Sequence, residues 1–212
     1  MMKVAKLASR LNWRRSPDAP YSGTWPRFFL FTDQNRLPDP LADPAAVMAR
    51  LPRGAAIVLR HTDPVLLAVL AQKTVAPAHA LGLKVLVAGD ARLAIRLRCD
   101  GVHLSQHQAR RGPLRITGMR PGFLVTAAAH DAMSLRRAGS AGADMVVLSP
   151  VFATASHPEA KPLGPVRFAR IAIVGGYPNV AVVALGGITA RHAKRLSLGP
   201  AYGVAAVGAW NT

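Results

Sequence analysis

Short apolar runs recur along the chain from residue 28 onwards, and within each run the apolar residues do not alternate with polar ones. Continuous runs rich in valine, isoleucine, leucine or phenylalanine are typical of parallel strands that are covered on both faces. The pattern therefore predicts eight strands, at Phe28–Phe31, Ala55–Leu59, Val85–Ala88, Val102–Leu104, Phe123–Ala127, Met145–Leu148, Val180–Leu185 and Val204–Val207.

Helix-start signals lie between these runs. Asp39-Pro40 and Asp63-Pro64 each place a capping residue before a proline that suits the first helical turn. Asp131 and Thr189 precede segments with helical spacing, at 133–138 and 190–198, and Gly199-Pro200 is a typical helix end. Strands that alternate with helices or long loops indicate an α/β protein with a parallel sheet.

Eight such units predict a single (β/α)8 TIM barrel. These barrels typically need about 250 residues, so a chain of 212 residues implies short loops and a trimmed C-terminal helix. The alternative is an open, doubly wound sheet with fewer strands. In a barrel, the functional face lies at the C-terminal ends of the strands, where the βα loops open.

The first 26 residues differ from the rest of the chain. Their charged residues are basic except Asp18, and Val4, Leu7 and Leu11 recur at the spacing of a short amphipathic helix. We therefore expect a basic N-terminal extension at 1–26 and a barrel domain at 27–212. The extension either packs outside the barrel or contacts an acidic partner as a basic arm.

The chain is strongly basic, with 27 lysines and arginines against 10 aspartates and glutamates and a formal net charge of +17. This balance raises a nucleic-acid-binding module as an alternative function. However, the arginines fall mostly on predicted helices, aromatic residues make up 6% of the chain, and no zinc or recognition-helix motif appears. We therefore expect a basic shell that attracts phosphates and diphosphates, without a nucleic-acid partner.

Several features indicate a cytoplasmic protein. The single cysteine, Cys99, cannot form an internal disulfide, which suits a reducing compartment. No apolar run is long enough to cross a membrane, and the first residues lack the apolar segment of a secretory signal. We expect no membrane contact.

The segment from Leu185 to Thr189 carries two glycines between a predicted strand and a predicted helix. Glycines at such a turn let the backbone approach a ligand closely, and the helix start supplies N–H groups for an anion. The turns after the last two strands form the usual phosphate site of TIM barrels. We therefore expect a phosphate here, and a tight turn without a ligand is the alternative.

Four motifs together resemble one enzyme family. In chain order they are Asp100-Gly101-Val102-His103-Leu104-Ser105-Gln106, Ala143-Asp144, Ser149-Pro150-Val151-Phe152-Ala153-Thr154 and Ala184-Leu185-Gly186-Gly187-Ile188-Thr189. From about Phe28 to Trp210 the chain resembles thiamine phosphate synthases and their TenI-like relatives. The resemblance implies a (β/α)8 barrel that uses Mg²⁺ to join hydroxymethylpyrimidine diphosphate to a thiazole phosphate and releases pyrophosphate. The resemblance is also compatible with a homo-oligomer.

The resemblance also implies a role for individual positions. Those that match catalytic residues are Arg60, His130 and His157. Those that match diphosphate-binding residues are Arg60 and Gly89, and those that match metal ligands are Asp90 and Gln108. Those that match residues holding the thiazole phosphate are Thr154, Ser156, Gly187, Val207 and Gly208.

Other positions depart from the family pattern. Val58 and Thr62 stand where the family has a glutamine and a lysine, and Ala128 replaces a serine that contacts pyrophosphate. Gly89 replaces an asparagine, and Gln108 replaces the second metal-binding aspartate. Since Mg²⁺ prefers carboxylates and phosphate oxygens, these changes weaken the metal and diphosphate half of the site.

The departures favour a second hypothesis, a TenI-like barrel without synthase activity that acts as a thiazole tautomerase or a phosphate-binding regulator. The histidine that such tautomerases use falls at Pro150 in this sequence. A different histidine would then have to move the proton: His61, His130 or His157.

A zinc site built from histidines is a further interpretation. Its candidate ligands are His61, His103, His107, His130 and His157, but no HxH or HExxH spacing supports it. His103 lies inside an apolar strand, so we predict a hydrogen-bonded structural histidine there.

Overall fold

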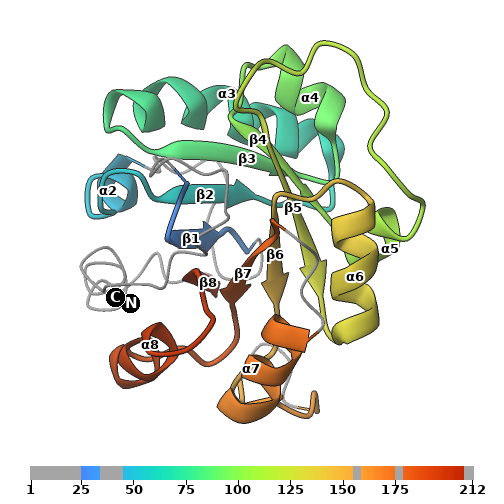
Figure 1. The fold of residues 1–212 in the computed structure, drawn as a ribbon. Coiled ribbons are helices and arrows are strands. Elements are labelled where there is room, and N and C mark those ends of the chain that lie inside the picture. The colour runs from blue at the N-terminus through green and yellow to red at the C-terminus, as the bar shows by residue number, and fades with distance from the viewer. Residues whose placement is uncertain (1–24, 34–44, 155–158, 175–178, 208–212) are drawn as a thin grey trace.

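The strands form a closed parallel barrel with helices on its outside (Figure 1). The computed structural model describes residues 25–33, 45–154, 159–174 and 179–207. The predicted TIM barrel is confirmed, and the alternative open sheet is wrong. In chain order the elements are β1 Phe28–Phe31, α2 Ala45–Met48, β2 Ala56–Leu59, α3 Pro64–Ala80, β3 Lys84–Ala88, α4 Ala91–Arg96, β4 Gly101–Leu104, α5 Gln106–Ala109, β5 Leu124–Ala129, α6 Ala132–Ser140, β6 Met145–Leu148, α7 Gly164–Val174, β7 Ala181–Ala184, α8 Ala190–Ser197 and β8 Gly203–Val207.

Each strand pairs in parallel with the next, and β8 pairs with β1 to close the barrel. The closing register runs from Phe28 opposite Val204 to Phe31 opposite Val207. Because all strands run in the same direction, their carboxyl ends lie at one end of the barrel, which we call the mouth.

Alternate residues of each strand point into the barrel or outward to the helices. In β6, Met145 and Val147 belong to the cluster that fills the lumen, whereas Val146 and Leu148 belong to the cluster under the helices. All four are buried. Burial on both faces explains why the strands read as continuous apolar runs in the sequence.

Predicted capping residues start three of the helices. The Asp63 carboxylate accepts two N–H groups of the first turn of α3. Asp131 accepts the N–H of Ser134 at 2.7 Å, and the Ser134 hydroxyl accepts the N–H of Asp131 at 3.0 Å, which completes a capping box on α6. Thr189 accepts the N–H of His192 at 3.2 Å and starts α8.

Some predictions concern segments outside the described residues. These are the N-terminal extension apart from Trp25 and Pro26, the capping pair Asp39-Pro40 and the trimmed helix after β8. Trp25 itself packs against the lumen cluster. None of the helices in the described part of the chain is long and apolar enough to span a membrane.

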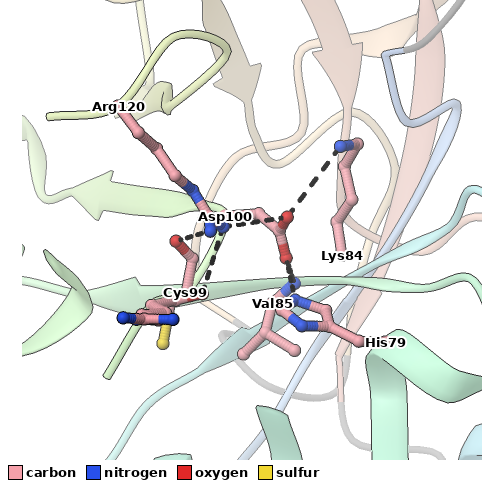
Figure 2. A network of polar contacts seen from close by, with 7 residues as sticks. His79, Lys84, Val85, Cys99, Asp100 and Arg120 are labelled. Atoms are coloured by element: carbon pink, nitrogen blue, oxygen red, sulfur yellow. Dashed lines mark hydrogen bonds and ion pairs between the residues drawn. The ribbon is translucent and has the colours of Figure 1, made fainter. Parts of the chain in front are cut away.

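A polar network around Asp100 joins several elements at the end of the barrel opposite the mouth (Figure 2). Asp100 Oδ2 accepts the N–H of Val85 in β3 and the Nε2–H of His79 at the end of α3, both at 2.8 Å. Arg120 Nη2 lies 3.4 Å from Asp100 Oδ1 and donates to the Cys99 carbonyl at 3.0 Å. The aspartate that opens the Asp-Gly-Val-His motif therefore holds β3, β4 and α3 together.

We expect Asp100→Ala to lower the free energy of unfolding by about 2 kcal/mol, because it leaves the Val85 N–H and the His79 imidazole without their acceptor and removes the carboxylate that faces Lys84 and Arg120. Denaturant unfolding followed by circular dichroism measures the change. Glu159→Ala, which removes an exposed carboxylate, is the control and should change stability by less than about 0.5 kcal/mol. Equal stability of the two variants would contradict a structural role for Asp100.

Candidate active site

The mouth gathers side chains from loops that are far apart in the sequence. The residue that follows each parallel strand reaches this end of the barrel. Arg60 follows β2, Asp90 follows β3, Gln108 lies in α5 after β4, His130 follows β5 and Gly187 follows β7. The fold thus brings these predicted site residues to one face.

Three predicted site residues, Ser156, His157 and Gly208, lie outside the described residues. Thr154 and Val207 are described, Thr154 in the loop after β6 and Val207 as the last residue of β8. Val207 pairs with Phe31 of β1, which places it at the mouth.

Arg60 is half-buried and anchored to the end of β1. Its Nε donates to the carbonyl of Thr32 at 2.8 Å, and its backbone N–H donates to the Thr32 hydroxyl at 2.8 Å. Its guanidinium carbon lies 5.4 Å from the centre of the Phe31 ring. Burial lowers the pKa of Arg60, and the charge of nearby Asp33 partly offsets this. Arg60 is therefore a fixed cation at the rim of the lumen.

His103 lies in the lumen, as the sequence predicted for a structural histidine. Its Nδ1 is 2.9 Å from the hydroxyl of Thr126, which itself donates to the carbonyl of Val102 at 3.2 Å. The imidazole packs edge to face against Phe31, 4.9 Å between ring centres. Burial, together with the positive charge of Arg60, lowers the pKa of His103 to about 3. Across the neutral pH range the ring is uncharged.

This lowered pKa makes stability depend on pH. Between the ordinary histidine value of 6.5 and about 3, the unfolded chain takes up a proton at His103 and the folded chain does not. Acidification below pH 6.5 should therefore destabilise the fold, by about 1–2 kcal/mol on reaching pH 5. His103→Gln should show a flatter dependence, measured by urea unfolding at several pH values.

The control for this comparison is His107→Gln, which replaces an exposed histidine. Its unfolding free energy should follow the same pH dependence as the unsubstituted protein. If His103→Gln also kept the full loss of stability between pH 6.5 and pH 5, a different group would account for it.

The two predicted metal positions have other partners in the fold. Asp90 is the N-cap of α4, and its Oδ1 accepts the N–H of Leu93 at 2.8 Å. Gln108 Oε1 accepts the N–H of Ser105 at 3.0 Å, and Gln108 Nε2 donates to the carbonyl of Gly89 at 2.8 Å. Since both partners are backbone groups, they fix which end of the amide is oxygen. Gln108 thus clips the loop after β4 to the loop after β3.

His130 faces the loop after β6. Its Nδ1 lies 2.8 Å from the carbonyl of Ser149, which can only accept, so Nδ1 carries the proton. That hydrogen bond fixes the ring and leaves Nε2 as the atom for proton transfer. In the described part of the chain, no three histidine, cysteine, aspartate or glutamate side chains form a cluster that could hold a metal. No histidine zinc site is thus found among these residues.

The double-glycine turn after β7 is packed against the loop after β6. Gly186 and Gly187 have φ angles of +102° and +60°. A Cβ at Gly186 would lie 2.8 Å from Pro150 Cα, and a Cβ at Gly187 would overlap the carbonyl oxygen of Ala153. The backbone N–H of Phe152 donates to the carbonyl of Gly186 at 3.0 Å. Two motifs distant in the sequence thus form one cradle, which we define as residues 149–154 and 185–189.

His192, which the sequence analysis did not select, braces this cradle. Its Nδ1 donates to the carbonyl of Gly187 at 2.9 Å, and its ring stacks on Phe152 with 3.7 Å between ring centres. The sequence did indicate that His192 lies near the glycine turn, because a residue three positions after the capping Thr189 falls in the first turn of the helix, beside the loop. The sequence did not indicate that His192 stacks on Phe152, which is forty residues away in the chain.

The comparisons with known proteins decide the family. The sequence model of the thiamine monophosphate synthase family matches residues 29–210. The chain belongs to this family. The match includes β2 to β8, all of β1 except Phe28, and the four motifs that carried the resemblance.

The relatives named here are 37% identical to the chain over a matched segment of little more than half its length. A putative thiamine-phosphate synthase 2 from Aquifex aeolicus is 37% identical over 54% of this chain and 59% of its own length. A thiamine-phosphate synthase from Methanoculleus marisnigri is 37% identical over 55% of this chain and 54% of its own length. The matched part spans little more than half the length of these curated relatives.

Solved structures show the same barrel. A thiamine phosphate pyrophosphorylase from Pyrococcus furiosus superposes with a TM-score of 0.64 at 17% identity, covering 87% of this chain and 88% of that one. An HpcH/HpaI aldolase from Desulfitobacterium hafniense superposes with a TM-score of 0.60 at 11% identity, covering 87% and 86%. At these sequence identities the structural similarity shows only the fold, which proteins of different function share.

Proposed function

We propose that the protein is a thiamine phosphate synthase-like enzyme of thiamine biosynthesis, which joins hydroxymethylpyrimidine diphosphate to a thiazole phosphate and releases pyrophosphate. The observation that carries the proposal is the cradle at the mouth, where the Gly186-Gly187 turn packs against the Pro-Val-Phe-Ala-Thr motif. Membership of the thiamine monophosphate synthase family supports it.

The cradle is the proposed site of the thiazole phosphate. Gly187 brings the backbone close to a ligand because no side chain fits there. Thr154 is the last residue of the first cradle segment and Val207 ends the neighbouring strand β8, and Ser156 and Gly208, outside the described residues, complete the proposed set. The start of α8, which has 8 residues, adds N–H groups and the positive end of its dipole.

Arg60 and His130 are the proposed catalytic residues on the pyrimidine side, and His157, which lies outside the described residues, is the third proposed catalytic residue. The bond between the pyrimidine methylene carbon and the diphosphate oxygen breaks, and its electrons leave with pyrophosphate. The thiazole ring nitrogen then donates its lone pair to that carbon and forms the new C–N bond. Arg60 would stabilise the negative charge on the leaving group, and a protonated His130 would donate to it from Nε2.

The described side chains fit Mg²⁺ poorly. The metal prefers carboxylates and phosphate oxygens, and Asp90 contributes one carboxylate whose Oδ1 already caps α4. The second position holds a neutral amide, whose oxygen accepts the Ser105 N–H and whose nitrogen donates to Gly89. We therefore derive no step through a metal ion.

A second candidate function is a TenI-like thiazole tautomerase or phosphate-binding regulator. The specific observation in its favour is the clip that Gln108 forms between two mouth loops, where the family pattern has a metal ligand. Such a protein would use the phosphate cradle and need no diphosphate.

The test is to incubate the full chain with both substrates, with Mg²⁺ and separately with a chelator, and to measure thiamine phosphate by liquid chromatography. We expect product in at least one condition and at least a tenfold loss in Arg60→Ala. Glu159→Ala serves as the control. If no product forms in either condition while the thiazole phosphate binds, the synthase proposal is wrong and the TenI-like function takes its place.

A further inference from the structure

A hollow of about 330 Å³ opens beside the predicted metal positions. It lies between the loop after β3 and the segment that contains α5 and the residues up to 116. Gly89, Asp90 and Gln108 form part of its wall. Its volume is at the lower end of the range for small-molecule sites, about 300–1,000 Å³, which leaves room for a diphosphate group. We call it the arginine hollow.

Three arginines belong to the wall of the arginine hollow: Arg92, Arg111 and Arg115. Arg111 Nη2 lies 3.1 Å from His107 Nε2, an uncharged partner when that nitrogen accepts. Among the described residues, neither Arg92 nor Arg115 has a carboxylate partner. Of the described residues in the wall, Asp90 alone carries a carboxylate, and its Oδ1 caps α4. The hollow therefore carries an excess of positive charge.

Arg92, Arg111 and Arg115 are exposed, as most arginines of the described chain are, and what sets these three apart is that they line the same hollow. Positive side chains around one hollow repel each other, and an anion bound between them relieves that repulsion. Guanidinium groups match phosphate oxygens well, because their N–H groups form two parallel hydrogen bonds to one phosphate. A ligand with two phosphates and several negative charges would satisfy all three side chains.

The wall of the hollow includes residues of the mouth, where the reaction is proposed to take place. Gly89 and Asp90 belong both to its wall and to the loop that ends β3 at the mouth. Gln108 Nε2 donates to the carbonyl of Gly89 at 2.8 Å, so this backbone oxygen already has a donor. Gln108 stands where the family pattern has an aspartate, so this wall carries one negative charge fewer. The change disfavours a bound metal ion and favours an anion bound directly by the protein.

We propose that the arginine hollow binds the diphosphate group of the substrate directly, with Arg92, Arg111 and Arg115 supplying the positive charge, so that binding does not require Mg²⁺. This inference rests on the proposed function, since it names the site for one of the two substrates. The ligand class is an organic diphosphate or pyrophosphate itself.

The test is calorimetric titration of the full chain with inorganic pyrophosphate, in EDTA and separately in Mg²⁺. We expect binding in EDTA, with an affinity within about threefold of that in Mg²⁺. Arg92→Gln and Arg115→Gln should each weaken binding in EDTA by at least tenfold. Arg170→Gln, which removes an exposed arginine of α7, is the matched control and should leave the affinity unchanged. Circular dichroism verifies that each variant is folded.

Asp90→Asn distinguishes the two kinds of site, because asparagine also caps helices well. Direct binding by arginines predicts that this variant keeps or increases the affinity in EDTA. Binding only in Mg²⁺, loss of binding in Asp90→Asn, or equal weakening in Arg170→Gln would each overturn the proposal. Pyrophosphate binding in EDTA without product would remove only the synthase function, whereas product with pyrophosphate binding only in Mg²⁺ would remove only the arginine site.

Discussion

Gly187→Ala is expected to weaken binding of the thiazole phosphate by about 30-fold, equivalent to about 2 kcal/mol. The added methyl group would overlap the Ala153 carbonyl and come within 2.9 Å of Phe152 Cβ. The φ angle of +60° adds backbone strain for any residue other than glycine. Relief requires the turn to move away from the loop after β6, which opens the cradle. Titration calorimetry with the thiazole phosphate measures the loss.

Gly142→Ala is the matched control for this experiment. Gly142 also has a positive φ, +84°, but a Cβ there meets no atom within 4 Å, and the residue lies before β6 at the opposite end of the barrel. The control carries the backbone strain without the crowding, so it should lower stability slightly and leave affinity unchanged. Similar affinity losses in both variants would show that general destabilisation, and not the cradle, causes the effect.

Gly101→Ala should give the largest loss of stability, about 3 kcal/mol, or roughly 6–12 °C in melting temperature for a chain of this size. Gly101 begins β4 and pairs with Leu124 of β5. A Cβ at this position would overlap the Leu124 carbonyl oxygen and approach Leu124 Cβ to 2.9 Å. The obstacle is backbone in a paired strand, so it cannot move aside as a flexible side chain would.

Gly199→Ala provides the comparison for Gly101→Ala. Gly199 does not have a left-handed φ, and a Cβ there would lie 3.5 Å from the nearest backbone oxygen, an ordinary contact. Thermal unfolding followed by circular dichroism should therefore show little change. A Gly101→Ala variant as stable as this control would mean that β4 and β5 separate more easily than their register indicates.

The fold could be predicted in detail because its signal is local. Met145–Leu148 and Phe28–Phe31 were predicted with their final boundaries, since both are apolar and end at polar residues. The fifth strand extends to Ala129, two residues beyond the prediction. Small residues such as Ala128 and Ala129 carry little strand signal of their own, and pairing with β6 keeps them in the sheet.

The candidate site was predicted less completely. Parallel strands bring Arg60, His130 and Gly187 to one end of any such barrel, so their shared location followed from the pattern. The contact of His192 with Phe152 did not follow, because Phe152 lies in the loop after β6 and His192 lies in the first turn of α8. The arginine hollow is a similar case, since Arg92 and Arg115 read as part of a general basic excess in the sequence.

The sequence alone determined the barrel, its mouth and the family, because apolar periodicity, capping residues and ordered motifs are properties of short segments. Only the tertiary structure decided what the individual mouth residues contact. It made Gln108 a clip between two loops and placed three arginines in the wall of one hollow. The physical reason is that hydrogen bonds and charge interactions act over a few ångströms in space, and the closure of the barrel sets which distant loops come within that range.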